Sequence, residues 1–333
     1  MADGAQLIYA QDATNPYEPT YDRPLGAMSV NIAVIGAGAL GCLFGGRLTE
    51  SGHDVHLLHY RQSYVDRLNE EGLTIESEDG ETTDIDVEAT TDASEVGPVD
   101  FAIVFVKSHQ TEAALAEHAA CIGPETDLLS LQNGLRHYDR LLDVVGEDRA
   151  FAGVTYQGAV AEEPGYVRVT SGGPSTFGGT NDAGARRIES ALEGAGFPVE
   201  LVDDPRAYIW AKQLMSLPIK PLAALTHLSN GELVATPETR ELMEQIVAEA
   251  EAVAECRGID IPMDDPMEEV VTTCEESHSH YSSMLQDVRA ERKTEIDDVN
   301  GAIVDIAHEE GVDVPVNELA TNLVRALEKS YLD

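Results

Sequence analysis

Short apolar runs alternate with amphipathic patterns through residue 150 of the chain. Strands are predicted near 30–35, 55–60, 100–106 and 127–132, and helices near 39–51, 62–71, 109–120 and 135–145. Strands that alternate with helices in this way are typical of a doubly wound parallel sheet. A Gly-rich stretch follows, and we expect it to complete the sheet with strands at 151–158, 166–170, 176–179 and 198–202.

The pattern changes near Pro205, after which apolar residues recur almost only at helical spacing. Long helices are predicted at 205–226, 237–257, 266–289, 293–310 and 316–330. The fold class is therefore α/β, with a doubly wound parallel sheet followed by an all-helical C-terminal domain. In such a protein we expect the active site in the cleft between the domains, facing the carboxyl ends of the strands.

Residues 29 to 41 connect the first strand to the first helix through the turn Gly36-Ala37-Gly38-Ala39-Leu40-Gly41. The first glycine allows a tight turn, the second lets the backbone approach a pyrophosphate, and the third lets the helix pack closely on the strand. Phosphates then lie at the helix N-terminus, where free N–H groups and the dipole favour an anion. The motif predicts a Rossmann-type dinucleotide-binding domain over 29–203 and leaves 204–333 as the helical substrate and catalytic domain.

The end of the second strand predicts which dinucleotide binds. An Asp or Glu there would hold the 2′-hydroxyl of NAD, whereas an Arg would hold the 2′-phosphate of NADP. The sequence at this point is His59-Tyr60-Arg61, without a carboxylate. Arg61 offers a planar fork suited to bidentate phosphate contact, so NADP, as NADPH, is favoured. The alternative is a solvated arginine that simply begins the next helix.

Composition adds a strongly acidic surface to this picture. The 61 Asp and Glu residues against 21 Lys and Arg residues give a formal charge of −40. Such a field repels nucleic acid and anionic membranes, so neither is expected as a partner. Because molar salt shortens the Debye length to about 3 Å and screens the repulsion, we hypothesise a halophilic archaeon as the source.

The 4 cysteines lie far apart, without the spacing of a disulfide framework or a zinc site. This fits a reducing cytoplasm and predicts no metal. Neither a membrane-spanning stretch nor a signal peptide is recognised. Residues 1–28 are polar and lack periodicity, so we expect a disordered extension or a start site placed too early, with Met28 just before the first strand. Whether the chain forms a homodimer stays open.

A reductase needs a hydride from the nicotinamide and a proton donor for the developing alkoxide. Lys212, on the first helix of the second half, and Glu295, at the expected start of another helix, are candidates. A lysine near its reference pKa of about 10.4 is protonated at neutral pH and can donate to a carbonyl oxygen. Both have plainer interpretations, as a surface lysine lying along its helix and as one of many exposed acids.

Two further candidates follow strands of the predicted sheet. Lys107 comes directly after the apolar run 101–106, and Asn133-Gly134 follows the next strand in the same way. Sheet-based sites lie at such ends, but Asn-Gly is equally typical of a plain turn. Asn230-Gly231 indicates the end of one helix and the start of the next.

Several motifs follow one another along the chain: Gly36-Ala-Gly-Ala-Leu-Gly41, Val106-Lys107-Ser108, Gln132-Asn133-Gly134, Trp210-Ala-Lys212, Asn230-Gly-Glu-Leu233 and the block from Ser282 to Asp297. With these motifs the chain resembles the ketopantoate reductases (2-dehydropantoate 2-reductases), the NADPH-dependent oxidoreductases of pantothenate and coenzyme A biosynthesis. The resemblance runs from residue 29 to about residue 330, and the last block is its most specific part.

By this resemblance, Lys212 is the general acid that protonates the C2 oxygen of the substrate while the nicotinamide delivers hydride to C2. Glu295 lies in the substrate site and positions Lys212 or a substrate hydroxyl. Ser283 binds the substrate carboxylate, and Asn230 contacts its hydroxyl. The resemblance also assigns residues to the cofactor: Lys107 and Asn133 beside the nicotinamide and its ribose, and Arg61 at the 2′-phosphate.

Three positions depart from the family pattern. Two asparagines expected on the Lys212 helix are replaced by Ser216 and Lys220, and one just before the serine pair is replaced by His280. Ser216 still offers a hydroxyl, but Lys220 places a cation where a neutral amide is expected. We count both among the substrate-binding residues. Lys220 either strengthens binding of a carboxylate or indicates a different 2-keto acid.

The predicted function is NADPH-dependent reduction of ketopantoate to pantoate by a cytoplasmic enzyme whose partner is a small-molecule 2-keto acid. Two alternatives stay open, namely a reductase of another small 2-keto acid on the same fold and a non-catalytic NADP-sensing regulator. A regulator has no need of a proton donor opposite the nicotinamide, so Lys212 and Glu295 argue against it.

Overall fold

The structure is a computed structural model that describes residues 29–332, and the extension expected at 1–28 lies outside the described residues. The strands are β1 (Asn31–Ile35), β2 (Asp54–Leu58), β3 (Leu73–Glu76), β4 (Thr82–Ile85), β5 (Glu88–Thr90), β6 (Phe101–Val104), β7 (Asp127–Ser130), β8 (Ala150–Thr155), β9 (Gly158–Glu163), β10 (Tyr166–Ser171), β11 (Ser175–Gly178) and β12 (Val199–Leu201). The α-helices are α1 (Ala39–Glu50), α2 (Gln62–Glu71), α3 (Thr111–Glu117), α4 (His137–Val145), α5 (Asp182–Gly194), α6 (Pro205–Ser216), α7 (Ile219–Thr226), α8 (Asn230–Ala235), α9 (Pro237–Cys256), α10 (Pro266–Glu276), α11 (Ser283–Arg289), α12 (Asn300–Glu310) and α13 (Pro315–Glu328).

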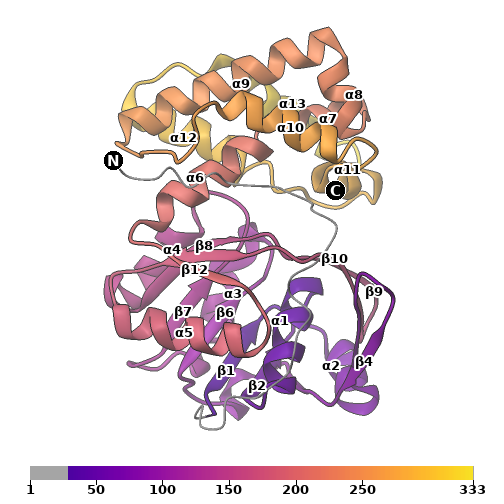
Figure 1. The fold of residues 1–333 in the computed structure, drawn as a ribbon, viewed down its shortest axis with the longest axis vertical. Coiled ribbons are helices and arrows are strands. Elements are labelled where there is room, and N and C mark those ends of the chain that lie inside the picture. The colour runs from indigo at the N-terminus through magenta and orange to yellow at the C-terminus, as the bar shows by residue number, and fades with distance from the viewer. Residues whose placement is uncertain (1–28, 333) are drawn as a thin grey trace.

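The predicted doubly wound sheet is confirmed. Eight strands lie in the order β12-β11-β8-β7-β6-β1-β2-β5, and Figure 1 shows them in the lower half of the molecule. All neighbours are parallel except β8 and β11, which pair antiparallel. Ile32 to Ile35 of β1 are fully buried, as expected of a strand covered by helices on both faces. The parallel order brings the carboxyl ends of β1, β6 and β7 to one edge.

A second, smaller sheet has the order β4-β3-β10-β9 and packs against α1. The expectation that the strand at 166–170 completes the main sheet is therefore wrong, because Tyr166–Ser171 pairs with β3 and β9 instead. Its residues alternate between apolar and polar, which suits a strand with one covered face. The strands β3 and β4 were not predicted, since each has only four residues: Leu73 and Ile75 are the apolar positions of β3, and Ile85 is the one apolar residue of β4.

The helices α6 to α13 form the second half, drawn above the sheet in Figure 1, with α6 packed on β8. The helix predicted at 205–226 is broken at Leu217-Pro218, where Pro218 lacks a backbone N–H. Ser216 therefore ends α6, and Lys220 lies on α7 rather than on the helix of Lys212. Among residues 29–332, no helix combines the length and the apolar character needed to cross a membrane.

Two other predicted helices also differ from the structure. The one at 266–289 is two helices, α10 and α11, because residues 277–282 leave the helix before Ser282 caps α11. The one at 293–310 begins only at Asn300, so Glu295 lies in the preceding turn and does not open a helix. Tertiary contacts hold that turn out of the helix, since the Thr294 N–H donates to the Glu328 carboxylate at 2.6 Å.

One continuous apolar core joins the two halves. It includes Val154 from β8, Trp210 from α6, Ile246 from α9 and Val299 before α12, all of them buried. Ion pairs cross the same boundary, so the loops after the strands of the sheet are held against the helices. The candidate site lies at this boundary.

Candidate active site

The glycine turn has the geometry expected of a dinucleotide cradle. Gly36 has a φ of +103°, and a Cβ there would lie 2.7 Å from the Val106 backbone nitrogen. A Cβ on Gly41 would lie 2.1 Å from the Gly36 carbonyl oxygen, so only glycine lets α1 approach the turn. Around Gly38 the space is open to 4 Å, and α1 begins there without a side-chain cap. This combination leaves room for a pyrophosphate beside free helix N–H groups.

Arg61 follows the end of β2 by three residues, and that strand end is held beside the glycine turn. The Gly36 and Ala37 N–H groups both donate to the Leu58 carbonyl at 3.0 Å, which fixes the end of β2 beside the turn. Arg61 occupies the N-cap position of α2, and its guanidinium lies 5.0 Å from the centre of the exposed Tyr60 ring. Within residues 29–332 it forms no ion pair, whereas most arginines of this acidic chain do. It is available to an external phosphate.

A cavity of about 200 Å³ lies between the end of β8 and the helical half. It contains five of the six residues expected to bind substrate, which are Lys212, Ser216, Lys220, Asn230 and Ser283. The remaining wall was not foreseen and consists of Tyr156, Met215, Ile219, Thr273 and Ser282. Tyr156 follows the carboxyl end of β8, and that position could have singled it out. Met215, Ile219 and Ser282 each adjoin a predicted residue in the sequence, Thr273 comes from α10, and none of the four carries a separate signal.

Lys212 is a confined ammonium rather than a surface side chain. Its Nζ donates to the Thr155 carbonyl at 2.6 Å and lies 5.3 Å from the centre of the Tyr156 ring. Burial, together with the positive charge of Lys220, lowers the pKa of Lys212 from 10.5 to about 8, and the negative charge of Glu295 opposes the change. A lysine with a pKa near neutrality is suited to give up a proton.

Glu295 does not line the cavity, but it lies within electrostatic range of both cavity lysines. Its Oε1 accepts from the Ser108 hydroxyl at 3.3 Å and from the Ser108 N–H at 3.5 Å. Arg140 supports this contact, because it donates to the Ser108 carbonyl at 2.7 Å and to Asp298 at 2.6 Å. The carboxylate is thus anchored to the loop after β6, at the boundary of the two halves.

The two predicted nicotinamide-side residues also lie at this boundary. Lys107 follows β6, and its Nζ is 2.8 Å from the Asp287 carboxylate of α11. Asn133 precedes Gly134, where a Cβ would lie 3.0 Å from the Asp298 carbonyl oxygen. The loops that follow β6 and β7 therefore pack on the helical half.

Asn230 and the serine pair form the far wall of the cavity. The Asn230 amide donates to the Ser277 hydroxyl at 2.8 Å, while its own Oδ1 is buried without a hydrogen-bond partner in the described chain. The Ser282 hydroxyl caps α11, so Ser283 is the member of this pair that is not used as a cap. His280 is exposed and does not line the cavity, so this departure from the family pattern is not part of the pocket wall.

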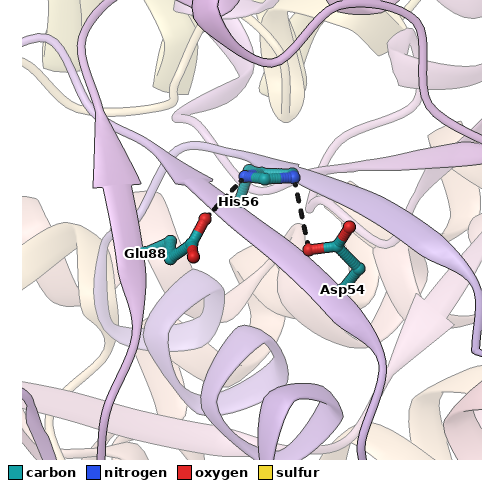
Figure 2. Close-up of side chains that lie close together, drawn as sticks. All are labelled: Asp54, His56 and Glu88. Carbon is teal, nitrogen blue, oxygen red and sulfur yellow. Dashed lines mark ion pairs between the residues drawn. The ribbon is translucent and has the colours of Figure 1, made fainter.

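A separate group of titratable side chains lies on the edge of the main sheet. Figure 2 shows His56 of β2 between Asp54 and Glu88, with each nitrogen 3.5 Å from a different carboxylate. One atom from each residue lies within 4.8 Å of the other two, a spacing that a metal ion can accept. The two carboxylates are 61% and 79% exposed, and they lie on opposite sides of the ring. We interpret the group as surface ion pairs, which contribute little stability.

Comparison with known proteins agrees with this geometry. Residues 32–182 match the family model described as ketopantoate reductase PanE/ApbA, and residues 204–328 match its C-terminal counterpart. The chain belongs to the ketopantoate reductase family. A 2-dehydropantoate 2-reductase of Halobacterium salinarum is 32% identical over 306 residues, which cover 90% of this chain and 99% of that relative.

Solved structures show the same fold over nearly the whole chain. A PanE/ApbA family ketopantoate reductase from Ralstonia eutropha superposes with a TM-score of 0.85 at 31% identity, covering 91% of this chain and all of that one. A ternary structure of D-mandelate dehydrogenase with NADH and anilino(oxo)acetate has a TM-score of 0.82 at 30% identity, covering 90% and 99%. The fold is therefore shared by a ketopantoate reductase and by an enzyme named for the 2-hydroxy acid mandelate.

Proposed function

We propose that the protein reduces 2-dehydropantoate to pantoate with NADPH. The observation that carries the proposal is the placement of Lys212, whose partly confined ammonium projects into a cavity at the junction of the sheet and the helices. Family membership gives the reaction class, and the cavity is of a size suited to a small keto acid.

A nicotinamide dinucleotide is the cofactor, held at the glycine turn between β1 and α1. When bound, it supplies the hydride that reduces C2 of the substrate. The open space at Gly38 accommodates the pyrophosphate, and Arg61 holds the 2′-phosphate that distinguishes NADPH from NADH. Lys107 and Asn133, in the loops after β6 and β7, take the nicotinamide end.

The side chains of the cavity then supply the proton and orient the substrate. Lys212 donates its proton to the C2 oxygen as negative charge develops there. Glu295 is a positioning residue, because its negative charge favours the protonated form of Lys212. Ser216, Asn230 and Ser283 offer neutral hydrogen-bonding groups to the hydroxyl and carboxylate of the substrate.

A second candidate is the reduction of a different small 2-keto acid. The similarity to D-mandelate dehydrogenase, an enzyme named for a different 2-hydroxy acid, favours it. The two candidates share the chemistry of Lys212 and differ only in the group attached to the keto acid.

The experiment is kinetic comparison of the wild type with Lys212→Met, together with NADPH titration. Loss of turnover by about 100-fold or more, with the NADPH dissociation constant unchanged, is the expected result for a general acid. Lys293→Met, which removes a lysine outside the cavity, is the matched control and should retain turnover. Unchanged turnover in Lys212→Met would reject the proposed role.

We also propose that residues 29–203 act as the cofactor domain and 204–333 as the substrate domain, and that the protein works in the cytoplasm. The separation of the glycine turn from the cavity helices supports the first point, and the absence of paired cysteines among residues 29–332 is in keeping with the second. Variants of the full chain test the division: Gly38→Ala should weaken NADPH binding and spare substrate binding, whereas Ser283→Ala should do the reverse.

A further inference from the structure

Lys220 is the least expected side chain of the cavity wall. It is only 8% exposed, and its Nζ has no hydrogen-bond partner among residues 29–332. Lysine is rarely buried without a partner, because an ammonium removed from water loses its hydration. Burial accordingly lowers the pKa of Lys220. A buried and unpartnered cation that lines a ligand cavity indicates that the ligand supplies the missing acceptor.

The acidic groups around Lys220 are already engaged elsewhere. Asp287 is held by Lys107 at 2.8 Å and by Arg292 at 2.9 Å, and Glu295 accepts from Ser108. Their charges favour the protonated form of Lys220, while the charge of Lys107 opposes it. Neither carboxylate lies within hydrogen-bond distance of the Lys220 Nζ.

The wall of the cavity is therefore positive. Besides its two lysines it contains only neutral polar and apolar residues, with no carboxylate. Lys212 and Lys220 lie on the successive helices α6 and α7, and each ammonium repels the other enough to affect the Lys212 pKa. An anion between them would relieve this repulsion.

We propose that Lys220 anchors the carboxylate of the substrate by a direct ion pair and so makes the cavity selective for 2-keto acids over their uncharged analogues. The proposal rests on the proposed function and deepens it. In a 2-keto acid the carboxylate and the reacting carbonyl are adjacent, so one molecule can engage both lysines. Ser283, assigned to the carboxylate by resemblance, then adds a neutral hydrogen bond to a charge held by Lys220.

This arrangement also couples binding of the substrate carboxylate to the protonation of Lys212. A bound carboxylate compensates the Lys220 charge, so Lys212 retains its proton when substrate is present. A ligand without a carboxylate lacks this effect and leaves the lysines repelling each other. Substrates with and without a carboxylate are thus expected to differ both in KM and in the pH dependence of their reduction.

The test compares a 2-keto acid with its methyl ester in the wild type, Lys220→Asn and Lys220→Met. We expect both variants to raise KM for ketopantoate about 10- to 100-fold, because the loss of a hydrogen bond to a charged group weakens binding by about this factor. KM for the methyl ester should change by less than about threefold. The alkaline limb of kcat/KM should also move to higher pH, because Lys212 has lost a positive neighbour. Lys293→Asn is the matched control, with both substrates unaffected.

Binding without turnover separates failure of this inference from failure of the proposed function. Oxamate, a small unreactive analogue of a 2-keto acid, should bind the cofactor-loaded wild type by calorimetry and bind Lys220→Asn at least 10-fold more weakly. Equal losses for acid and ester in the variants, or oxamate affinity unchanged by them, would overturn the role of Lys220. Wild-type protein that binds oxamate through Lys220 but reduces no 2-keto acid would overturn the proposed function alone.

Discussion

Replacing Lys212 with Met should stabilise the folded protein while it removes activity. Folding carries Lys212 from an environment in which its pKa is 10.5 to one in which it is about 8, so the folded state holds the proton less well than the unfolded state. At about 1.4 kcal/mol for each pKa unit, the difference costs about 3 kcal/mol of stability while the lysine is protonated in both states.

Lys212→Met does not recover the whole of this stability cost. Met has nearly the volume of Lys and fits an apolar helix, but it leaves the Thr155 carbonyl without its donor. That loss costs about 1 kcal/mol, so the expected net gain is about 2 kcal/mol at neutral pH. The gain is complete below the folded pKa of about 8 and fades as the pH rises towards 10.5, because Lys212 is then neutral in both states.

The assay is urea unfolding of wild type and Lys212→Met in molar KCl, at neutral pH and near the reference pKa of about 10.4. The difference in unfolding free energy should shrink between the two conditions. Lys293→Met, which alters an exposed lysine, should show no such pH-dependent difference. A Lys212→Met protein that is less stable than wild type at neutral pH would refute the account of Lys212 as a desolvated cation.

Three further outcomes are expected. Arg61→Ala should weaken NADPH binding about 10-fold or more and leave NADH binding unchanged, whereas Arg186→Ala, on the opposite part of the sheet half, should alter neither; a uniform loss for both cofactors would contradict the 2′-phosphate role. Gly38→Ala should lower NADPH affinity with little change in stability, because nothing lies within 4 Å of the added Cβ. Gly41→Ala should lower both NADPH affinity and stability, because its Cβ would lie 2.1 Å from the Gly36 carbonyl oxygen, and thermal unfolding beside NADPH titration separates the two cases. The midpoint of unfolding should rise with KCl towards molar concentration, since a charge of −40 repels itself less at a Debye length of about 3 Å, and indifference to salt would reject the halophilic interpretation.

The parts of the fold that could be predicted have local causes. The strand, glycine turn and helix of residues 31–50 follow from stereochemistry within a few residues, because Gly36 and Gly41 have no room for a side chain. The start of the helix that carries Lys212 is likewise predicted by the helical spacing of its apolar residues and by the Pro in its first turn.

What could not be predicted depends on contacts between distant segments. Lys107 and Asp287 are 180 residues apart, and nothing in either neighbourhood indicates their ion pair. The turn that holds Glu295 is kept from being helical by Glu328, far along the chain. The pairing of β10 with β3 joins segments about 90 residues apart, and β3 is only four residues long, too short for its apolar pattern to indicate a strand or its partner.

We propose that this chain is an NADPH-dependent reductase of a small 2-keto acid, with ketopantoate as its substrate. The most direct measurement is the rate of NADPH oxidation in molar KCl with ketopantoate, beside NADH and a panel of other 2-keto acids including phenylglyoxylate. We expect the highest kcat/KM for ketopantoate with NADPH. Preference for another keto acid would contradict the substrate assignment, and NADPH binding without turnover of any keto acid would contradict the claim that the protein is an enzyme.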